Sequence, residues 1–329
     1  MTPDLPSELK AALARKAEGL SRNAAAQRAD AISRTYRDGG GSGRIRTGTD
    51  ALAYALARMP ATYAAIAASL NALTEVNPDF APTSLLDVGA GPGTATWAAS
   101  EAFASLETFT LLDANMALRD LAAELAQSHL RLAPMHYHSG DARKALAEAP
   151  EADLVVASYV INELGDSERA VLADAMWAKT RDTLLVVEPG TPAGYARIID
   201  LRARLIAKGA HVIAPCPHDA ACPLTKPDWC HFTQRLQRSR AHKQLKGADL
   251  PYEDEKFSYV ILSRNAPAQR PARVLAQPLV TKIAVTAKTC AAEGIKAASV
   301  PHRDKAAYKR AKKWNWGDAI FPENGIGVE

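Results

Sequence analysis

Residues 84–93 of this 329-residue chain read SLLDVGAGPG. The first five residues form a short, continuous apolar run, which is typical of a buried strand. Gly89, Gly91 and Gly93 follow at once, and glycines permit a tight turn and a close approach of the backbone to a ligand. Because residues 94–103 have a helical pattern, we predict a strand, a glycine-rich turn and a helix that begins at the turn.

Strand and helix patterns continue to alternate beyond this turn. Further strands are predicted at residues 109–112, 135–138, 154–159 and 184–187. Further helices are predicted at residues 116–126, 166–179 and 193–208. Strands that alternate with helices of this length predict an α/β protein with a Rossmann-like, doubly wound parallel sheet.

The rest of the chain extends this sheet domain in both directions. Apolar residues recur at helical spacing before it, and residues 257–262 and 279–285 are expected to be the final strand pair of the sheet. Five regions are therefore predicted: an N-terminal helical region at 1–80, the Rossmann-like domain at 81–208, a Cys-rich insertion at 209–255, the final strands at 256–300 and a basic tail at 301–329.

Composition limits the protein class. Four cysteines in a chain of this length exclude a disulfide-stapled scaffold. No apolar run approaches the ~20 residues of a membrane span. The first 20 residues mix acidic and basic side chains and match neither a secretory nor a transit signal. We therefore expect a monomeric, cytoplasmic, bacterial protein without a membrane partner.

Acidic residues follow three consecutive predicted strands, where an open α/β sheet binds its ligand. Asp87 stands two positions before Gly89, where a carboxylate repels a pyrophosphate but accepts from an ammonium group. Asp113 is placed to bind ribose hydroxyls, and Asp141 to meet an adenine edge. The pattern resembles class I methyltransferases and predicts an S-adenosylmethionine site made by Asp87, Gly89, Gly91, Gly93, Asp113, Asp141 and Ser158.

The methyl-acceptor side is less specific. Residues 158–164 read SYVINEL and lack the Asn/Asp-Pro-Pro-aromatic turn of amine methyltransferases. Asn162 and Glu163 either contact substrate or cap the next helix. No catalytic residue is assigned, and cofactor binding is better supported than methyl transfer.

Cysteines occupy positions 216, 222, 230 and 290. Three thiols within 15 residues indicate a shared ligand, but the Cys-x-x-Cys pairs of zinc knuckles do not occur. Wide spacing, prolines after two of the cysteines and a distant fourth thiolate are typical of a [4Fe–4S] cluster. His218 and His231 leave a zinc site open, and buried free thiols are a third alternative.

Charge is divided unequally along the chain. Residues 1–200 contain 18 Lys and Arg against 25 Asp and Glu, whereas residues 201–329 contain 22 against 11. This excess predicts a polyanionic partner for the second part, where a basic helix is expected at 234–247 and cations precede two tryptophans in the tail. The predicted RNA-binding residues are Arg235, Arg238, Arg240, Lys243, Lys246, Lys309, Arg310, Lys312 and Lys313.

Several segments of the chain together resemble the Rsm22 family, the methyltransferase-like proteins of the small ribosomal subunit. They are EPGTP at 188–192, PCPH at 215–218, DWCHF at 228–232, YEDEKFSY at 252–259 and Cys290. The resemblance spans about residues 45–317. It implies a Rossmann-like methyltransferase domain, a [4Fe–4S] cluster held by Cys216, Cys222, Cys230 and Cys290, and association with small-subunit ribosomal RNA during assembly.

The sequence therefore predicts an iron–sulfur protein that binds S-adenosylmethionine and methylates or binds small-subunit ribosomal RNA. Two alternatives stay open. One is a non-catalytic assembly factor that retains the fold, and the other is a small-molecule methyltransferase with a structural zinc site.

Overall fold

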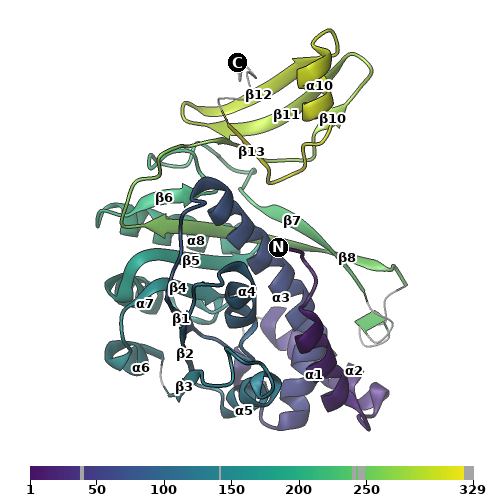
Figure 1. Ribbon diagram of the computed structural model, residues 1–329, viewed down its shortest axis with the longest axis vertical. Helices are drawn as coiled ribbons and strands as arrows, with labels where there is room; N and C mark the ends of the chain where they lie inside the picture. The colour runs from purple at the N-terminus through teal and green to yellow at the C-terminus, as the bar shows by residue number, and fades with distance from the viewer. Residues whose placement is uncertain (38–40, 141, 239–241, 244–248, 322–329) are drawn as a thin grey trace. The chain divides into compact units, whose positions relative to one another are not determined.

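The computed structural model describes residues 1–37, 41–140, 142–238, 242–243 and 249–321. These residues form two compact units. Unit 1 comprises residues 1–70, 81–184 and 234–255, and unit 2 comprises residues 71–80, 185–233 and 256–329. The division falls within four elements, namely α3 (Gly48–Val76), β5 (Thr180–Pro189), β7 (Phe232–Gln237) and β8 (Tyr252–Ser263), which Figure 1 labels.

Unit 1 alternates strands and helices as the sequence predicts. Its strands are β1 (Ser84–Val88), β2 (Thr108–Asp113), β3 (His136–Ser139) and β4 (Ala152–Ser158), together with the first parts of β5 and β8 and the last part of β7. Its helices are α1 (Ser7–Ala17), α2 (Arg22–Arg37), η1 (Ser42–Arg44), most of α3, α4 (Thr94–Ala102), α5 (Met116–Ala126), α6 (Ala142–Glu148), η2 (Ile161–Glu163) and α7 (Asp166–Lys179).

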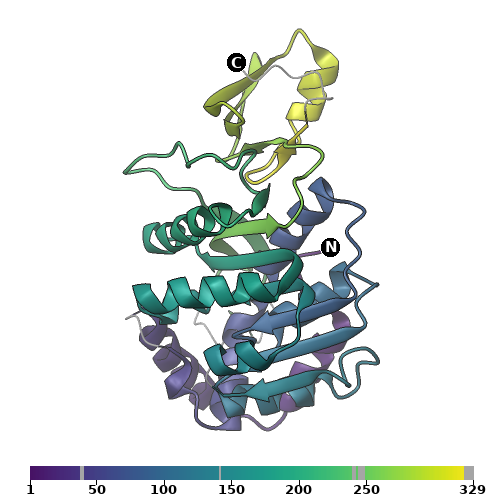
Figure 2. The same ribbon diagram turned by 90° about the vertical axis from the view of Figure 1, so that its left-hand side faces the viewer.

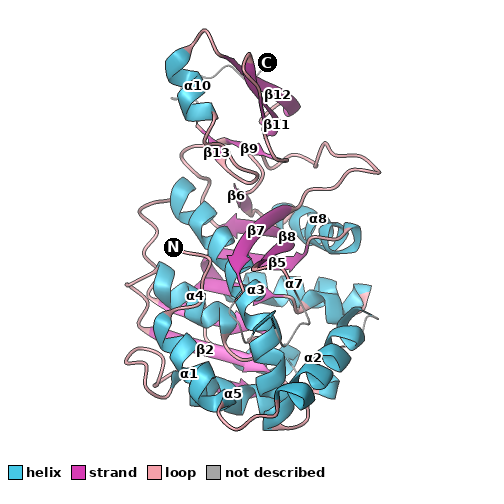
Figure 3. Ribbon diagram, turned by 90° about the vertical axis from the view of Figure 1, so that its right-hand side faces the viewer, coloured by secondary structure: helices cyan, strands magenta, loops and turns pink. Residues whose placement is uncertain are grey.

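The sheet order is β3-β2-β1-β4-β5-β8-β6, and β7 pairs with β8. Strand β1 pairs in parallel with both β2 and β4, so that Leu86 lies opposite Thr110 on one side and Val155 on the other. Four of the five β1 residues are buried, because helices lie on both sides of the unit 1 strands (Figures 2 and 3). The predicted Rossmann-like arrangement is confirmed for the parallel strands β3, β2, β1 and β4, whereas the sheet as a whole is mixed because β6 pairs antiparallel with β8.

Helix α3 is 29 residues long and rich in alanine, whose small side chain allows close packing. Its Ala61 and Ala64 form a buried cluster with Leu236 of β7 within unit 1. No helix among the described residues is long and apolar enough to cross a membrane.

Unit 2 contains α8 (Pro192–Ile206) and β6 (His211–Ala214), which pairs antiparallel with β8. Its second sheet contains β9 (Ala272–Val274), β10 (Leu279–Val280), β11 (Ala284–Ala291), β12 (Gly294–Pro301) and β13 (Ala319–Ile320). Helix α10 (Lys305–Ala311) packs on this sheet, burying Ala307 and Ala311 against Val285 and Val300 (Figure 1).

Two predicted elements are wrong. The basic segment that begins at residue 234 is not helical in its first part, because residues 232–237 form β7. Phe232 and Leu236 are buried four positions apart, and this spacing fits the period of a helix and also that of a strand. The segment at 279–285 does not complete the main sheet either, since β10 and β11 pair with each other in the second sheet.

Candidate functional site

The glycine turn after β1 is shaped by backbone conformation and by one close contact. Gly89, Gly91 and Gly93 all have positive φ, at 69°, 53° and 80°. The amide of Gly89 donates to the carbonyl oxygen of Leu112 at 2.8 Å, which joins the turn to β2. A Cβ at position 89 would lie 2.4 Å from Cγ2 of Val160, so this position has no space for a side chain. Only glycine meets both conditions.

A cavity of about 250 Å³ opens at this turn in unit 1. Its lining includes four of the predicted cofactor residues, namely Gly89, Gly91, Asp113 and Ser158. Gly93 is instead the N-cap residue of α4 and is not among the described lining residues. Asp141 lies outside the described residues. The cavity therefore lies at the carboxyl ends of β1, β2 and β4, where parallel sheets bind ligands.

Asp113 holds the edge of this cavity. One carboxylate oxygen accepts from the Gly91 amide at 2.8 Å, and the other accepts from the Asn115 amide at 2.7 Å. Burial raises the pKa of Asp113, and these backbone donors partly offset the increase. Each oxygen has a further lone pair, so the carboxylate retains the capacity to bind hydroxyl groups. Tyr137 supports the turn by donating its hydroxyl to the Gly91 carbonyl oxygen at 2.8 Å.

Asn115 is a site residue that the sequence interpretation missed. Its Oδ1 accepts from the Leu118 amide at 3.1 Å and caps α5, while its Nδ2 donates to the carbonyl oxygens of Ser42 and Ile45 at 3.0 and 2.9 Å. The N-terminal segment is thereby attached beside the cavity, which Ser42 also lines. Its position before a helical pattern was the available signal.

Asp87 lies beneath the turn, fully buried at 0% exposure. Its Oδ2 accepts from the amide and the hydroxyl of Thr96, at 3.1 and 2.8 Å, and so holds the first turns of α4. Its Oδ1 accepts from no residue that the structure describes. Burial raises the pKa of Asp87 to about 7, against the lowering effect of the Thr96 hydrogen bonds. A buried carboxylate with one free oxygen is a candidate partner for a cationic ligand group.

The segment after β4 forms another wall of the cavity. Tyr159 has a φ of 57°, a left-handed conformation that is strained for an aromatic residue. Its hydroxyl donates to Oε1 of Glu255 at 3.0 Å, and Nη2 of Arg58 lies 3.4 Å from the same oxygen. Asn162 and Glu163 belong to η2 rather than to the cap of α7, whose N-cap residue is Gly165. Both Tyr159 and Glu163 line the cavity.

In unit 2, the loop between β6 and β7 and strand β11 carry the four cysteines, and all four are free thiols. Burial raises the pKa of Cys230, and the charges of Cys216, Cys222 and Cys290 raise it further. Burial and the same kind of interaction, with Cys216 and Cys222, raise the pKa of Cys290 to about 12. The four thiols therefore lie within electrostatic reach of one another.

Neighbouring side chains surround these thiols. Tyr195 donates its hydroxyl to Sγ of Cys222 at 3.2 Å, and Nε2 of His218 lies 3.8 Å from Sγ of Cys290. His231 stacks on Trp229 with ring centroids 4.9 Å apart and meets Trp316 edge-on at 4.8 Å. In the described parts of the chain, no group of three or more His, Cys, Asp or Glu side chains is arranged to hold a metal ion.

The predicted RNA-binding residues differ in how they are held. On β7, Arg235 forms a two-point ion pair with Asp254 at 2.7 and 2.8 Å, and Nε of Arg238 lies 3.3 Å from Glu253. Lys243 is described, whereas Arg240 and Lys246 lie outside the described residues. The remaining four, Lys309, Arg310, Lys312 and Lys313, are exposed on or just after α10.

Together, the strand order, the glycine turn and the cavity at the carboxyl ends of the strands define a Rossmann-like methyltransferase fold. A family model described as mitochondrial small ribosomal subunit Rsm22 matches residues 48–321. The chain belongs to this Rsm22 family, as the resemblance in its sequence indicated.

Two curated relatives agree with the family. The human ribosome assembly protein METTL17, mitochondrial, is 29% identical over 288 residues, which are 82% of this chain and 62% of that protein. The Rsm22-cox11 tandem protein 2, mitochondrial, of Schizosaccharomyces pombe is 26% identical over 345 aligned positions, covering 86% of this chain and 44% of that protein. The chain thus spans less than two thirds of the length of either relative.

Solved structures are more distant. Magnesium protoporphyrin IX methyltransferase from Synechocystis, with bound S-adenosylmethionine, is 12% identical with a TM-score of 0.41, over 70% of this chain and 89% of that chain. TrmN from Thermus thermophilus is 15% identical with a TM-score of 0.37, over 63% and 52%. The fold assignment therefore rests on the strand order and the glycine turn.

The expectation of a bacterial cytoplasmic protein is wrong. The family model and both relatives carry the word mitochondrial in their names. The expectation came from the composition of the first 20 residues, which reports local charge and hydropathy and does not identify a compartment.

Asp87 gives the site a testable pH dependence. Because the folded-state pKa of about 7 lies above the ordinary value of 3.8, the folded chain binds this proton more tightly than the unfolded chain. The resulting stability is complete below about pH 4 and is lost as the pH rises toward about 7. Asp87→Asn should remove this loss. Between about pH 4 and about pH 7, we therefore expect the urea midpoint of the wild type to fall relative to that of the variant.

Asp120→Asn is the control, because Asp120 is an exposed carboxylate on α5 that pairs with Arg119. It is measured over the same pH range. A difference from wild type that stays constant with pH for Asp87→Asn would contradict the burial effect.

Proposed function

We propose that this chain is an S-adenosylmethionine-binding, iron–sulfur protein that acts on or binds small-subunit ribosomal RNA during ribosome assembly. The observation that carries the proposal is the family match over residues 48–321, which includes all four cysteines and every described residue that lines the cavity except Ser42. The human relative is named a ribosome assembly protein, which supports the same partner for this chain.

The chemistry of the cavity supports the proposed cofactor. Asp113 would accept from the ribose hydroxyls, since both of its oxygens retain a lone pair. Asp87 is fully buried and is not among the described residues that line the cavity. Its Oδ1 has no donor from the described residues, and the ammonium group of the cofactor would supply one if it reached this depth. The glycine turn allows the ligand to approach the backbone closely. When bound, S-adenosylmethionine supplies a methyl group on a sulfonium centre, ready for transfer to a nucleophile.

A non-catalytic assembly factor is the second candidate. The segment after β4 lacks the turn that positions an amine for methylation, and the hydroxyl of Tyr159 donates to Glu255. Such a factor would use the cavity and its cofactor to stabilise unit 1. Transfer of labelled methyl groups from the cofactor to small-subunit ribosomal RNA distinguishes the two candidates, with Asp113→Ala as the control that weakens cofactor binding.

Four thiols support a metal centre bound by Cys216, Cys222, Cys230 and Cys290. A [4Fe–4S] cube binds one cysteine at each iron, so its ligands stand further apart than the ligands of a single ion. The four thiols lie close enough to alter one another's pKa, which supports a shared centre. His231 stacks on Trp229, whereas Nε2 of His218 lies 3.8 Å from Sγ of Cys290, so a zinc site that includes His218 is the alternative metal centre. The cluster would connect the β6–β7 loop to β11.

The first prediction from the proposed function concerns the cofactor. Asp113→Ala should weaken binding of S-adenosylmethionine by roughly 5- to 150-fold, because two ribose hydroxyls lose their acceptor at a cost of about 1–3 kcal/mol. Titration calorimetry measures this change, and Asp120→Ala is the matched surface control. A thermal melt without ligand checks that the variant remains folded. If Asp113→Ala and the wild type bound the cofactor with equal affinity, this cavity would not be the cofactor site.

The second prediction concerns the metal. Protein purified without oxygen should be brown and contain about four irons per chain. A Ser substitution at any of the four cysteines should lose the iron, whereas His231→Ala should retain it. Elemental analysis and the visible spectrum report both results. A colourless protein with one zinc per chain would mean that the metal centre is a structural zinc site and not an iron–sulfur cluster.

The third prediction concerns RNA. Neutralising Lys309, Arg310, Lys312 and Lys313 should flatten the logarithmic salt dependence of binding to small-subunit ribosomal RNA by roughly 3 units, at ~0.7–0.9 per phosphate contact. Arg235→Gln should have a smaller effect than one such contact, because this arginine is already paired with Asp254. Filter binding between about 50 and 200 mM salt measures the slopes. An unchanged slope for the fourfold variant would argue for a different RNA surface.

A further inference from the structure

Three large apolar side chains are exposed within residues 279–283 of unit 2, which we call the hairpin tip because they lead from β10 to β11. Leu279 and Val280 form β10 and are 65% and 45% exposed, and Ile283 is 80% exposed. The other large apolar side chains that are exposed among the described residues stand alone in the sequence. Single exposed apolar side chains are ordinary on a protein surface, whereas a group of them indicates a contact surface.

The backbone of the hairpin tip is held by hydrogen bonds. The hydroxyl of Thr281 donates to the Ala284 carbonyl oxygen at 2.8 Å and accepts from the amides of Ile283 and Ala284, at 3.2 and 3.0 Å. The amide of His302 donates to the Ile283 carbonyl oxygen at 2.7 Å, and the hydroxyl of Tyr308 donates to the Thr281 carbonyl oxygen. A tip that is fixed in this way loses little conformational freedom when a partner binds.

Helix α10 covers one face of this hairpin (Figure 1). Strand β10 pairs Leu279 with Thr286 and Val280 with Val285. Val285 is buried against α10, so the alternation of side chains places Leu279 on the opposite face, together with the exposed Thr286. The core of the second sheet therefore does not depend on Leu279, and another role is needed to explain an apolar residue there.

Cations accompany the apolar side chains. Lys282 is exposed at the tip, and residues 300–313 beside it contain six Lys and Arg against one acid, Asp304. The side chain of Asp304 caps α10 by accepting from the Ala307 amide at 3.0 Å. Nζ of Lys312 lies 5.8 Å from the ring centroid of Tyr308, whose hydroxyl reaches the tip. The apolar tip and the cations of α10 thus belong to one surface, and its charge is complementary to a polyanion.

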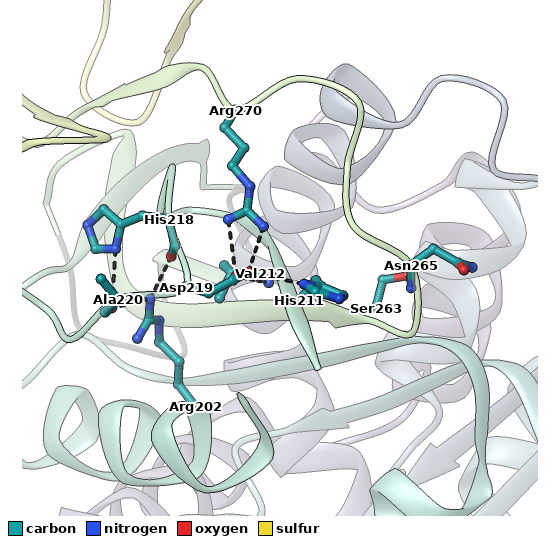
Figure 4. A network of polar contacts seen from close by, with 9 residues as sticks. All are labelled: Arg202, His211, Val212, His218, Asp219, Ala220, Ser263, Asn265 and Arg270. Carbon is teal, nitrogen blue, oxygen red and sulfur yellow. Dashed lines mark hydrogen bonds and ion pairs between the residues drawn. The ribbon is translucent and has the colours of Figure 1, made fainter. Parts of the chain in front are cut away.

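Other cations of unit 2 are engaged inside the fold. Arg270 donates to both carboxylate oxygens of Asp219, at 2.7 and 3.1 Å (Figure 4). Arg202 donates to the carbonyl oxygens of His218 and Ala220, at 2.7 and 2.8 Å, and so holds the loop after β6. Cations that are held in this way are poorly placed to contact a phosphate. The exposed cations of α10 and the tip are better placed for it.

We propose that the hairpin tip contacts unpaired nucleotides of small-subunit ribosomal RNA, while the cations of α10 contact the neighbouring phosphates. This inference rests on the RNA partner of the proposed function and assigns a surface to it. Unpaired bases in RNA loops and bulges are splayed out and are bound by apolar contact and stacking, and aliphatic side chains also act as wedges between base steps.

The ring of His302 favours a base as the ligand of this surface. His302 is exposed beside the tip and meets Tyr308 edge-on, with ring centroids 4.8 Å apart. A base can stack on such a planar ring, with Leu279 and Ile283 in contact with the same nucleotide or the next one. An anionic lipid surface is the competing partner for a tip that is both cationic and apolar, and the test includes it.

The test removes the apolar contacts and keeps the charge. Leu279→Ser combined with Ile283→Ser is the tip variant, because both side chains are exposed. Leu130→Ser combined with Val171→Ser is the matched control, since these are exposed aliphatic side chains of unit 1. Lys282→Gln is the charge variant. Circular dichroism and a thermal melt check folding, and Ile283→Ala is a milder second variant if the tip variant does not fold.

Filter binding to small-subunit ribosomal RNA between about 50 and 200 mM salt gives both the affinity and its salt dependence. The tip variant should bind about tenfold more weakly at each salt concentration, with the slope of the wild type, because apolar contacts release no counterions. Lys282→Gln should instead flatten the slope by ~0.7–0.9. The control should match the wild type, and a fully paired RNA duplex should be bound equally by the wild type and the tip variant.

Three results would overturn the inference while RNA binding itself stands. They are equal affinity of the folded tip variant and the wild type for ribosomal RNA, an equal loss of affinity for the paired duplex, and a tip variant that keeps its RNA affinity but no longer sediments with vesicles of phosphatidylcholine and phosphatidylglycerol. The last result would assign the surface to lipid. A wild type that binds no ribosomal RNA at about 100 mM salt would instead refute the RNA partner of the proposed function, and the inference with it.

Discussion

The close approach of Val160 to Gly89 is the constraint on which the candidate cofactor site depends. Strands β1 and β4 are parallel neighbours, so the segments that leave their carboxyl ends must share the same space. They do so because position 89 has no side chain, and its positive φ turns the chain toward β2. Asp113 then joins the turn through the Gly91 amide. The cavity is therefore a consequence of strand register and one missing Cβ.

Local patterns were enough to predict the elements around this site. The apolar run of β1 and the glycines behind it have one structural interpretation, and β2, β4 and α5 follow from their periods. Strand β7 was not predicted because its two buried apolar residues are four positions apart, a spacing that fits both a helix and a strand. Its cationic side chains also favour a helix when tertiary contacts are ignored. The second sheet was missed because β-patterns specify strands without specifying their partners.

The site residues also divide into those that local sequence can identify and those that only the folded chain reveals. Asp113 and the glycine turn could be found because each of them directly follows a predicted strand, which is a signal in the neighbouring sequence. Asn115 acts through Ser42, and Arg202 acts through a loop 16 residues away, so their roles exist only in the folded chain. The strained backbone of Tyr159 is likewise invisible in a sequence, since nothing in residues 158–164 requires a left-handed tyrosine.

Net charge is also an incomplete guide to a binding surface. Residues 201–329 carry twice as many basic as acidic side chains, but that excess includes three cations with other tasks. Arg235 is bound at two points by Asp254, Arg270 balances Asp219, and Arg273 is buried. An ion pair presents little net field to a phosphate, and a buried guanidinium group cannot contact a phosphate of a partner at the surface. The charge available to RNA is therefore smaller than the composition suggests, and the exposed cations on and after α10 are one part of it among the residues that the structure describes.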